Sequence, residues 1–169
     1  GRAALKPISC RNEAVRWFTS RGFLVISPVR IGYGETGGSD VEAASCNAAR
    51  DYAATARIAA RAIDAASTYA ETLPYVRHDR ILLVGQSAGG IATLAYAAHP
   101  RPEVSAIINM AGGNGGHLHG RDNENCHPEL LARAAGEFGT TSRLPELWVY
   151  AANDSYFAPA IATAMHAAF

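Results

Sequence analysis

The sequence predicts an α/β protein in which helices cover both faces of a mainly parallel sheet. Two patterns predict this fold. Short apolar runs of strand length alternate with longer amphipathic or alanine-rich runs of helix length along the whole chain. The chain also has 169 residues, which is enough for one domain with its own core, and it contains no internal repeat. We therefore treat residues 1–169 as a single domain.

Charge and composition exclude several classes of partner. The 15 basic residues equal the 15 acidic ones, so nothing favours binding to nucleic acid or to an anionic membrane. No apolar run approaches the roughly 20 residues of a membrane span. The sequence carries no signal for a particular oligomeric state.

The first half of the chain begins with a predicted helix and strand. Residues 12–21 read as a helix that ends at a glycine, and residues 23–29 as a strand rich in valine and isoleucine. A glycine-rich loop over residues 30–40 follows, and such loops at strand ends often line binding sites. Tyr33 in this loop is either a substrate-pocket residue or a packing residue on a turn. Residues 47–73 then form a long amphipathic helix.

The most informative stretch lies in the middle of the chain. Residues 81–84 are an apolar run of strand length, and an alanine-rich helical run begins at Ala88. Between them, Gly85-Gln86-Ser87-Ala88-Gly89 gives the pattern G-x-S-x-G. This order of strand, tight turn and helix is the context of a nucleophile elbow.

The residue types of this turn suit such an elbow. A strand that turns into a helix within a few residues forces the central Ser87 into a strained conformation, and glycines allow the close approach. The Ala88 N–H would then stabilise an oxyanion at the helix N-terminus. A phosphate-binding turn is the alternative, but no Gly-Lys-Ser/Thr follows, and Ser87 replaces the second glycine of a dinucleotide fingerprint.

The second half of the chain continues the alternation. We expect a buried strand over residues 104–110 and a loop over 111–127 that is dense in Gly, Asn and His. A loop of this length is usually functional or mobile, and we expect it to cover the site. A helix over 128–138, a strand over 147–151 and a last helix over 156–169 complete the chain.

Asp154 is the candidate for the acid of a catalytic triad. It follows the strand 147–151, and catalytic groups collect at the carboxyl ends of parallel strands. It also comes after Ser87, in the chain order that this architecture uses. The alternative is that Asp154 caps the last helix, a contribution of about 1 kcal/mol.

The base of such a triad is not evident. Only His166, among six histidines, follows Asp154, and it falls inside the predicted helix 156–169. At about 1.5 Å rise per residue, it would lie roughly 15 Å along the helix from the acid. We therefore expect the chain to be part of a longer enzyme whose base lies beyond Phe169.

Four further residues are candidates for the substrate pocket: Tyr33, Gln86, His117 and His119. His117 and His119 form an H-x-H pair on the long loop that could hold a metal ion. No third ligand is convincing, so we predict no metal and place both histidines facing the substrate or solvent.

The three cysteines are too scattered for a disulfide framework or a zinc site. Either they are three free thiols, or one pair is bridged in an oxidising compartment. The pair that we would then choose is Cys46 with Cys126.

The chain resembles α/β-hydrolases of the dienelactone hydrolase-like and prolyl oligopeptidase-like group. The resemblance covers nearly the whole chain, and its carrying blocks are Arg30-Ile31-Gly32-Tyr33-Gly34, Gly85-Gln86-Ser87-Ala88-Gly89-Gly90, Asn109-Met110-Ala111-Gly112-Gly113 and residues 147–157.

The resemblance implies Ser87 as nucleophile, Asp154 as acid and a histidine beyond Phe169. It also implies a fold truncated at both ends, with the first strands before or around Gly1. Dienelactone hydrolases proper use cysteine as nucleophile, so their substrate is not expected. Such proteins are often exported by bacteria, so both cytoplasm and periplasm remain open.

We therefore expect a serine hydrolase that cleaves a carboxylic ester through an acyl-enzyme. It would need no cofactor and would act on a small ester or a short peptide. Three alternatives stay open: a serine peptidase of the prolyl oligopeptidase type, a catalytically silent binding protein of the same fold, and a nucleotide-binding α/β domain.

Overall fold

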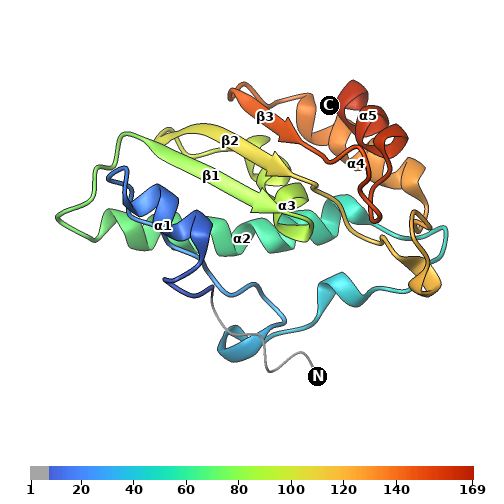
Figure 1. Ribbon diagram of the computed structural model, residues 1–169, viewed down its shortest axis with the longest axis horizontal. Coiled ribbons are helices and arrows are strands. Elements are labelled where there is room, and N and C mark those ends of the chain that lie inside the picture. The colour runs from blue at the N-terminus through green and yellow to red at the C-terminus, as the bar shows by residue number, and fades with distance from the viewer. Residues whose placement is uncertain (1–7) are drawn as a thin grey trace.

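The structure is a computed structural model that describes residues 8–169. It is an α/β fold in which three short parallel strands are interleaved with helices (Figure 1). The main elements are α1 (Glu13–Thr19), α2 (Tyr52–Glu71), β1 (Ile81–Gln86), α3 (Ala88–Ala97), β2 (Val104–Met110), α4 (Pro128–Gly139), β3 (Glu146–Val149) and α5 (Pro159–Ala168). Three single-turn 3₁₀ helices lie in the loops: η1 (Gly34–Thr36), η2 (Val41–Ala43) and η3 (Leu118–Gly120).

The three strands form one sheet in the order β1-β2-β3, and both pairings are parallel. Gln86 pairs with Met110, and Met110 pairs with Val149, so all three strands end at the same edge. The loops that follow the strands therefore meet at one edge of the sheet. This is the edge at which α/β proteins usually place their sites.

One face of the sheet carries the core. Helix α3 packs directly on β1 and β2, α2 and α4 pack on α3, and α5 packs on α4. In Figure 1, α3 lies behind β1 and β2, with α2 and α4 on either side of it. The largest apolar side chains that are fully buried belong to this layer: Tyr52, Leu94, Ile107, Leu131, Phe138, Phe157 and Met165. Burial of these side chains is the main stabilising contribution to the fold.

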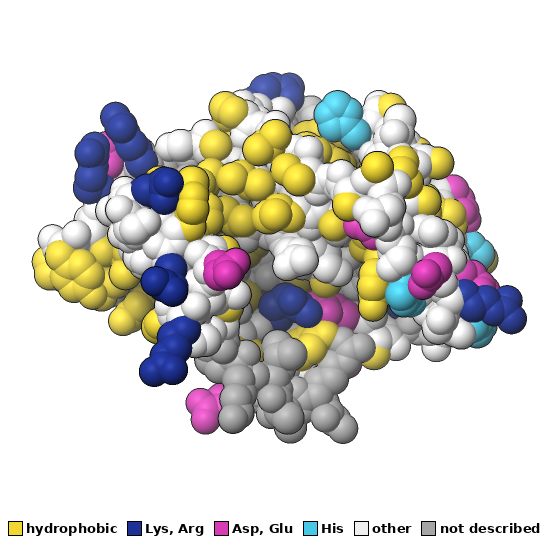
Figure 2. Space-filling view, in the orientation of Figure 1, with side chains coloured by type: hydrophobic (Ala, Val, Ile, Leu, Met, Phe, Trp, Pro, Cys, Tyr) yellow, Lys and Arg dark blue, Asp and Glu magenta, His cyan; other side chains and the backbone are white. Residues whose placement is uncertain are grey.

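The other face of the sheet is open, which corrects the prediction of helices on both faces. Val84, Met110, Leu147 and Val149 point to this face and are each more than two-fifths exposed. Figure 2 shows apolar side chains gathered over the strands. The side chains of both faces are apolar, as in a sheet buried on both sides. Among residues 8–169, however, no helix packs on the second face, and α1 buries no residue.

The prediction of a strand over residues 23–29 is wrong. The structure has no strand there, and Phe23, Leu24 and Ile26 are exposed. In Figure 1 the chain between α1 and α2 runs below the sheet, outside it. A strand is stable only where its backbone pairs with a sheet edge, and β1 pairs only with β2 in the described residues. Strand propensity alone could not supply that partner.

The other predicted elements are present, with shifted ends. The helix expected over 47–73 begins five residues later, at Tyr52, because Asp51 caps it by accepting the Ala54 N–H at 2.8 Å. The strand over 104–110 is confirmed at both ends. The last helix begins at Pro159 rather than at residue 156, which leaves residues 150–158 as a turn beside the sheet edge. None of the described helices is long and apolar enough to cross a membrane.

A disulfide joins Cys46 to Cys126, the pair that the sequence analysis favoured, and Cys10 is a free, exposed thiol. The bond links the segment before α2 to the loop before α4, 80 residues away along the chain. The Tyr52 hydroxyl donates to the Cys126 carbonyl beside it. Two long loops are therefore held together near the start of two core helices.

Replacing both bridged cysteines by alanine should destabilise the protein. Closing a loop of 80 residues restricts the unfolded chain, so we expect the free energy of unfolding to fall by about 2–4 kcal/mol. Denaturant unfolding of the Cys46→Ala/Cys126→Ala variant measures this loss. Cys10→Ala is the matched control and should change stability little, and equal loss in both variants would contradict the structure.

Candidate active site

The site is built on the turn between β1 and α3, where Ser87 adopts φ 52° and ψ −123°. A positive φ is rare and costly for a residue with a side chain. Backbone hydrogen bonds hold it there. The Ser87 N–H donates to the Met110 carbonyl at 3.1 Å, and its carbonyl accepts from the N–H groups of Gly90 and Gly113 at 2.8 and 3.0 Å. The strained turn that the sequence predicted is therefore confirmed, and the Ser87 side chain is exposed beyond the sheet edge.

Three glycines, Gly85, Gly90 and Gly112, make this turn possible because a Cβ at any of them would overlap neighbouring atoms. A Cβ on Gly85 would lie 2.6 Å from the Gly89 carbonyl carbon, and one on Gly90 would lie 2.6 Å from Cα of Gly112. A Cβ on Gly89 would meet nothing within 4 Å. Helix α3 thus lies close to β1 and to the chain after β2, and the turn at Ser87 follows from that closeness.

A buried polar group supports the turn from below. Asn109 on β2 is fully buried, and its Nδ2 lies 3.4 Å from the Tyr150 hydroxyl, which donates to the Gly112 carbonyl at 2.7 Å. Burial raises the pKa of Tyr150 to about 12, although its hydrogen bonds with Asn109 and Gly112 act in the opposite direction. Tyr150 therefore remains a protonated donor at neutral pH and fixes the backbone that holds Ser87.

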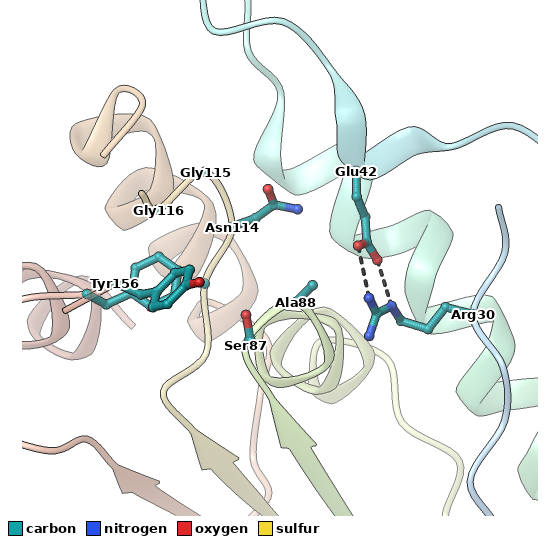
Figure 3. A pocket seen from close by; sticks show the side chains of 10 residues that line it. Arg30, Glu42, Ser87, Ala88, Asn114, Gly115, Gly116 and Tyr156 are labelled. Carbon is teal, nitrogen blue, oxygen red and sulfur yellow. Dashed lines mark hydrogen bonds and ion pairs between the residues drawn. The ribbon is translucent and has the colours of Figure 1, made fainter. Parts of the chain in front are cut away.

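Ser87 faces a cavity of about 340 Å³ (Figure 3). Four separate parts of the chain form its walls: the segment before α2, the start of α3, the loop after β2 and the loop after β3. The lining residues are Arg30, Glu42, Ser87, Ala88, Gly113, Asn114, Gly115, Gly116, Tyr156 and Phe157. Ala88 is the first residue of α3, so its N–H has no partner within the helix and is available to a ligand.

An ion pair forms one wall of this cavity. The Arg30 guanidinium donates to both oxygens of Glu42, at 2.7 and 3.0 Å, and the Tyr33 hydroxyl donates to Glu42 at 2.6 Å. Burial raises the pKa of Tyr33, and the Glu42 carboxylate raises it further. Tyr33 is buried and is not among the residues that line the cavity.

Asp154 lies in the turn after β3 and is partly buried. One of its carboxylate oxygens accepts the N–H groups of Tyr156 and Phe157, at 2.8 and 2.9 Å. This local turn places both aromatic residues in the cavity wall. Asp154 does not cap α5, whose N-cap is Ala158. Within residues 8–169, no hydrogen bond links it to Ser87.

The two loop histidines lie outside the cavity wall. His117 stacks on the Tyr156 ring at 3.7 Å between centroids, and its Nε2 lies 3.1 Å from Ser155 Oγ and 3.2 Å from Asp122. His119 is exposed and pairs with Glu124 at 2.8 Å. Each histidine therefore has its own carboxylate partner, and the two do not share a ligand position.

No described histidine occupies the position of a base. Within residues 8–169, none of the six histidines forms a hydrogen bond with Ser87 or Asp154. His166 on α5 packs edge-on against the Trp148 ring, 5.3 Å between centroids. Gln86, the fourth pocket candidate, is exposed at the end of β1 and does not line the cavity.

One group of possible metal ligands exists among the described residues. Donor atoms of Cys46, Cys126 and His127 lie within 4.8 Å of one another. The two sulfurs are joined in the disulfide, and His127 Nδ1 is 3.0 Å from Glu129. A disulfide sulfur is not a thiolate and is a poor metal ligand, so this group does not form a metal site in the oxidised protein.

Several residues of the cavity wall were not among the predicted site residues. Arg30, Glu42 and Asn114 line the cavity, but a charged residue or amide in a loop carries no signal of what it faces. Asn109 did carry a signal, because an amide inside the apolar run 104–110 must find a buried partner. Asn109 was therefore predictable as a buried polar residue, although it was not among the predicted site residues.

No protein-family model matches the chain, and no curated protein matches it either.

Substitution of the elbow glycines by alanine should show which of them are required for close packing and which are not. Gly90→Ala should lower the free energy of unfolding by about 3 kcal/mol or prevent folding, because its Cβ overlaps Gly112. Gly89→Ala is the matched control, since it lies in the same helix with open space around it. It should be neutral or stabilise by up to about 1 kcal/mol. Thermal unfolding of both variants gives the comparison, and equal effects would contradict the packing described.

Tyr150 should make stability fall at high pH. Its pKa is raised to about 12 in the folded chain from about 10 in an unfolded one. A raised pKa means that the folded state holds the proton more tightly, so the stabilisation is complete below pH 10. It is lost as pH rises from about 10 to 12. Denaturant unfolding across this range should show a steeper loss for the wild type than for Tyr150→Phe, and equal slopes would contradict the assignment.

Proposed function

We propose that this chain carries the nucleophile, the acid and one oxyanion donor of a serine hydrolase that cleaves carboxylic esters. The observation that carries the proposal is the positive φ of Ser87, at a strand-to-helix turn that opens on a cavity. This backbone conformation is costly and persists only where the surrounding packing enforces it. Such strain is typical of a nucleophile elbow.

The proposed mechanism is acyl transfer through Ser87. Its Oγ attacks the ester carbonyl, a histidine takes the Oγ proton, and the alcohol leaves with that proton. The Ala88 N–H at the start of α3 stabilises the oxyanion of the tetrahedral intermediate, aided by the positive end of the helix dipole. The histidine then takes a proton from water, which attacks the acyl-enzyme carbonyl. The carboxylic acid is released as the bond to Ser87 Oγ breaks and Oγ takes that proton back.

Asp154 is proposed to orient the histidine. It follows β3 at the sheet edge where β1 and β2 also end. Its recorded hydrogen bonds with Tyr156 and Phe157 use only one oxygen of the carboxylate. Because none of the described histidines forms a hydrogen bond with Ser87 or Asp154, we assign the base to a histidine that follows Phe169. This assignment fits a member of the α/β-hydrolases of the dienelactone hydrolase-like and prolyl oligopeptidase-like group.

A catalytically silent binding protein of the same fold is the second candidate. The observation in its favour is that no described histidine contacts Ser87. A silent relative would keep the cavity and its walls but would not activate the serine hydroxyl.

Labelling with a fluorophosphonate tests the proposal. In the parent protein that includes the residues after Phe169, we expect covalent labelling that Ser87→Ala abolishes. Asp154→Asn keeps an oxygen that can accept the two backbone N–H groups but removes the charge, so it should slow labelling roughly a hundredfold or more. Asp122→Asn, an exposed carboxylate beside His117, is the matched control and should label normally.

The same preparations should hydrolyse 4-nitrophenyl esters in proportion to their labelling, and residues 1–169 alone should hydrolyse them little. Absence of Ser87-dependent labelling in the parent protein would overturn the hydrolase and favour the silent binding protein.

A further inference from the structure

We propose that Asn114 is a substrate-binding residue whose side-chain NH₂ donates a hydrogen bond to a neutral oxygen of the substrate's acyl group. The site would then prefer acyl groups that carry an ether, carbonyl or hydroxyl oxygen near the scissile carbonyl over purely aliphatic ones. That the ligand is an ester rests on the proposed function. The donor itself does not depend on catalysis.

The orientation of the Asn114 amide follows from its partner. Nη2 of Arg50 lies 2.9 Å from Oδ1 of Asn114. A guanidinium has only donors, so the amide atom that faces it must be the oxygen. The NH₂ group of Asn114 therefore points away from Arg50, and the usual ambiguity between the two amide orientations does not arise.

Arg50 is itself held in place, so it is a rigid anchor for this amide. Arg50 is only 7% exposed. It also donates to the backbone carbonyls of Glu42, at 3.0 Å, and Ala44, and its guanidinium lies 5.0 Å from the centre of the Tyr52 ring. Rotation of Asn114 would leave a buried cation with one acceptor fewer, which is costly.

The freed donor faces the cavity that Ser87 lines. Asn114 and Ser87 are both among the residues of its wall, and in Figure 3 the amide projects into the space that the Ser87 hydroxyl faces. Within residues 8–169, the Asn114 NH₂ has no hydrogen-bond partner, while its oxygen is occupied. Asn114 is also partly buried, so a ligand that covered it without an acceptor would leave a desolvated donor.

The chemistry of the wall determines which group fits this donor. An NH₂ group needs an acceptor, so an ammonium or a purely alkyl group gains nothing from it. The nearby charges of Arg30 and Glu42 are paired with each other at 2.7 Å, so this wall does not require a charged ligand. The opposite wall consists of Tyr156, Phe157 and the backbone of Gly115 and Gly116. A short neutral acyl group with one oxygen acceptor meets both conditions.

Two inert ligands that differ in one atom test this inference without turnover. N-phenyl methoxyacetamide and N-phenyl butanamide have the same shape, but the first carries an ether oxygen where the second carries CH₂. Their dissociation constants can be measured by NMR titration of residues 1–169, since the amides are not cleaved. One neutral hydrogen bond should make the ether bind roughly three- to tenfold more tightly, with a shift of the Asn114 NH₂ signals.

Asn114→Asp is the informative variant, because the carboxylate still accepts from Arg50 but no longer offers a donor. It should fold normally and lose the preference for the ether. Asn123→Asp places the same charge on an exposed position of the same loop and should keep the preference. Ser87→Ala should also keep it, which separates this test from the hydrolase proposal.

The inference is overturned if the wild type binds both amides equally, or if Asn114→Asp keeps the ratio. Failure of the hydrolase proposal would show instead in the fluorophosphonate labelling, which does not use these ligands. In a protein that does label, Asn114→Asp should raise KM for 4-nitrophenyl methoxyacetate but not for the butyrate. A loss confined to kcat for both esters would identify an oxyanion donor instead and would also overturn the inference.

Discussion

The structure depends on one close approach, where α3 packs against β1, β2 and the chain after β2 at positions that have no room for a Cβ. Gly85, Gly90 and Gly112 provide the space, and the turn between strand and helix then has too few residues to avoid a positive φ at Ser87. Asn109, which is buried on β2, and Tyr150, which is partly buried just after β3, fix the same backbone. Strain at Ser87 is thus a consequence of packing elsewhere, as is usual for residues held in unfavourable regions of φ and ψ.

A second constraint acts on the cavity, whose walls come from distant parts of the sequence. Arg50 ties the segment around Glu42 to Asn114, and the Cys46–Cys126 disulfide ties the same two regions a few residues away. A loop that lines a cavity is usually free to move. Here a buried cation and a covalent bond limit that freedom, so the loops that line the cavity are held in a defined arrangement.

The sequence was sufficient for those parts of the protein that depend on local signals. The G-x-S-x-G turn and the apolar run 104–110 each carry a local signal, and the structure has both. The long helix was also expected, but its start was placed five residues early because the Asp51 cap was not recognised. The strand over 23–29 was wrong because a strand requires a partner, and propensity says nothing about partners. The cavity wall was largely missed for a similar reason. Glu42 and Asn114 meet through Arg50, and no spacing rule connects three residues that lie 8 and 64 positions apart.

The open face of the sheet has a thermodynamic consequence. Side chains such as Leu147, which is 56% exposed, are already hydrated in the folded chain. Unfolding therefore adds less newly wetted apolar area than it would in a sheet covered on both sides, and the heat capacity increment scales with that area. The heat capacity change of unfolding should therefore fall below the usual value of about 12–15 cal/mol/K per residue. A smaller heat capacity change makes the curve of stability against temperature flatter. Cooling would then weaken this fold less than it weakens one with a fully enclosed sheet.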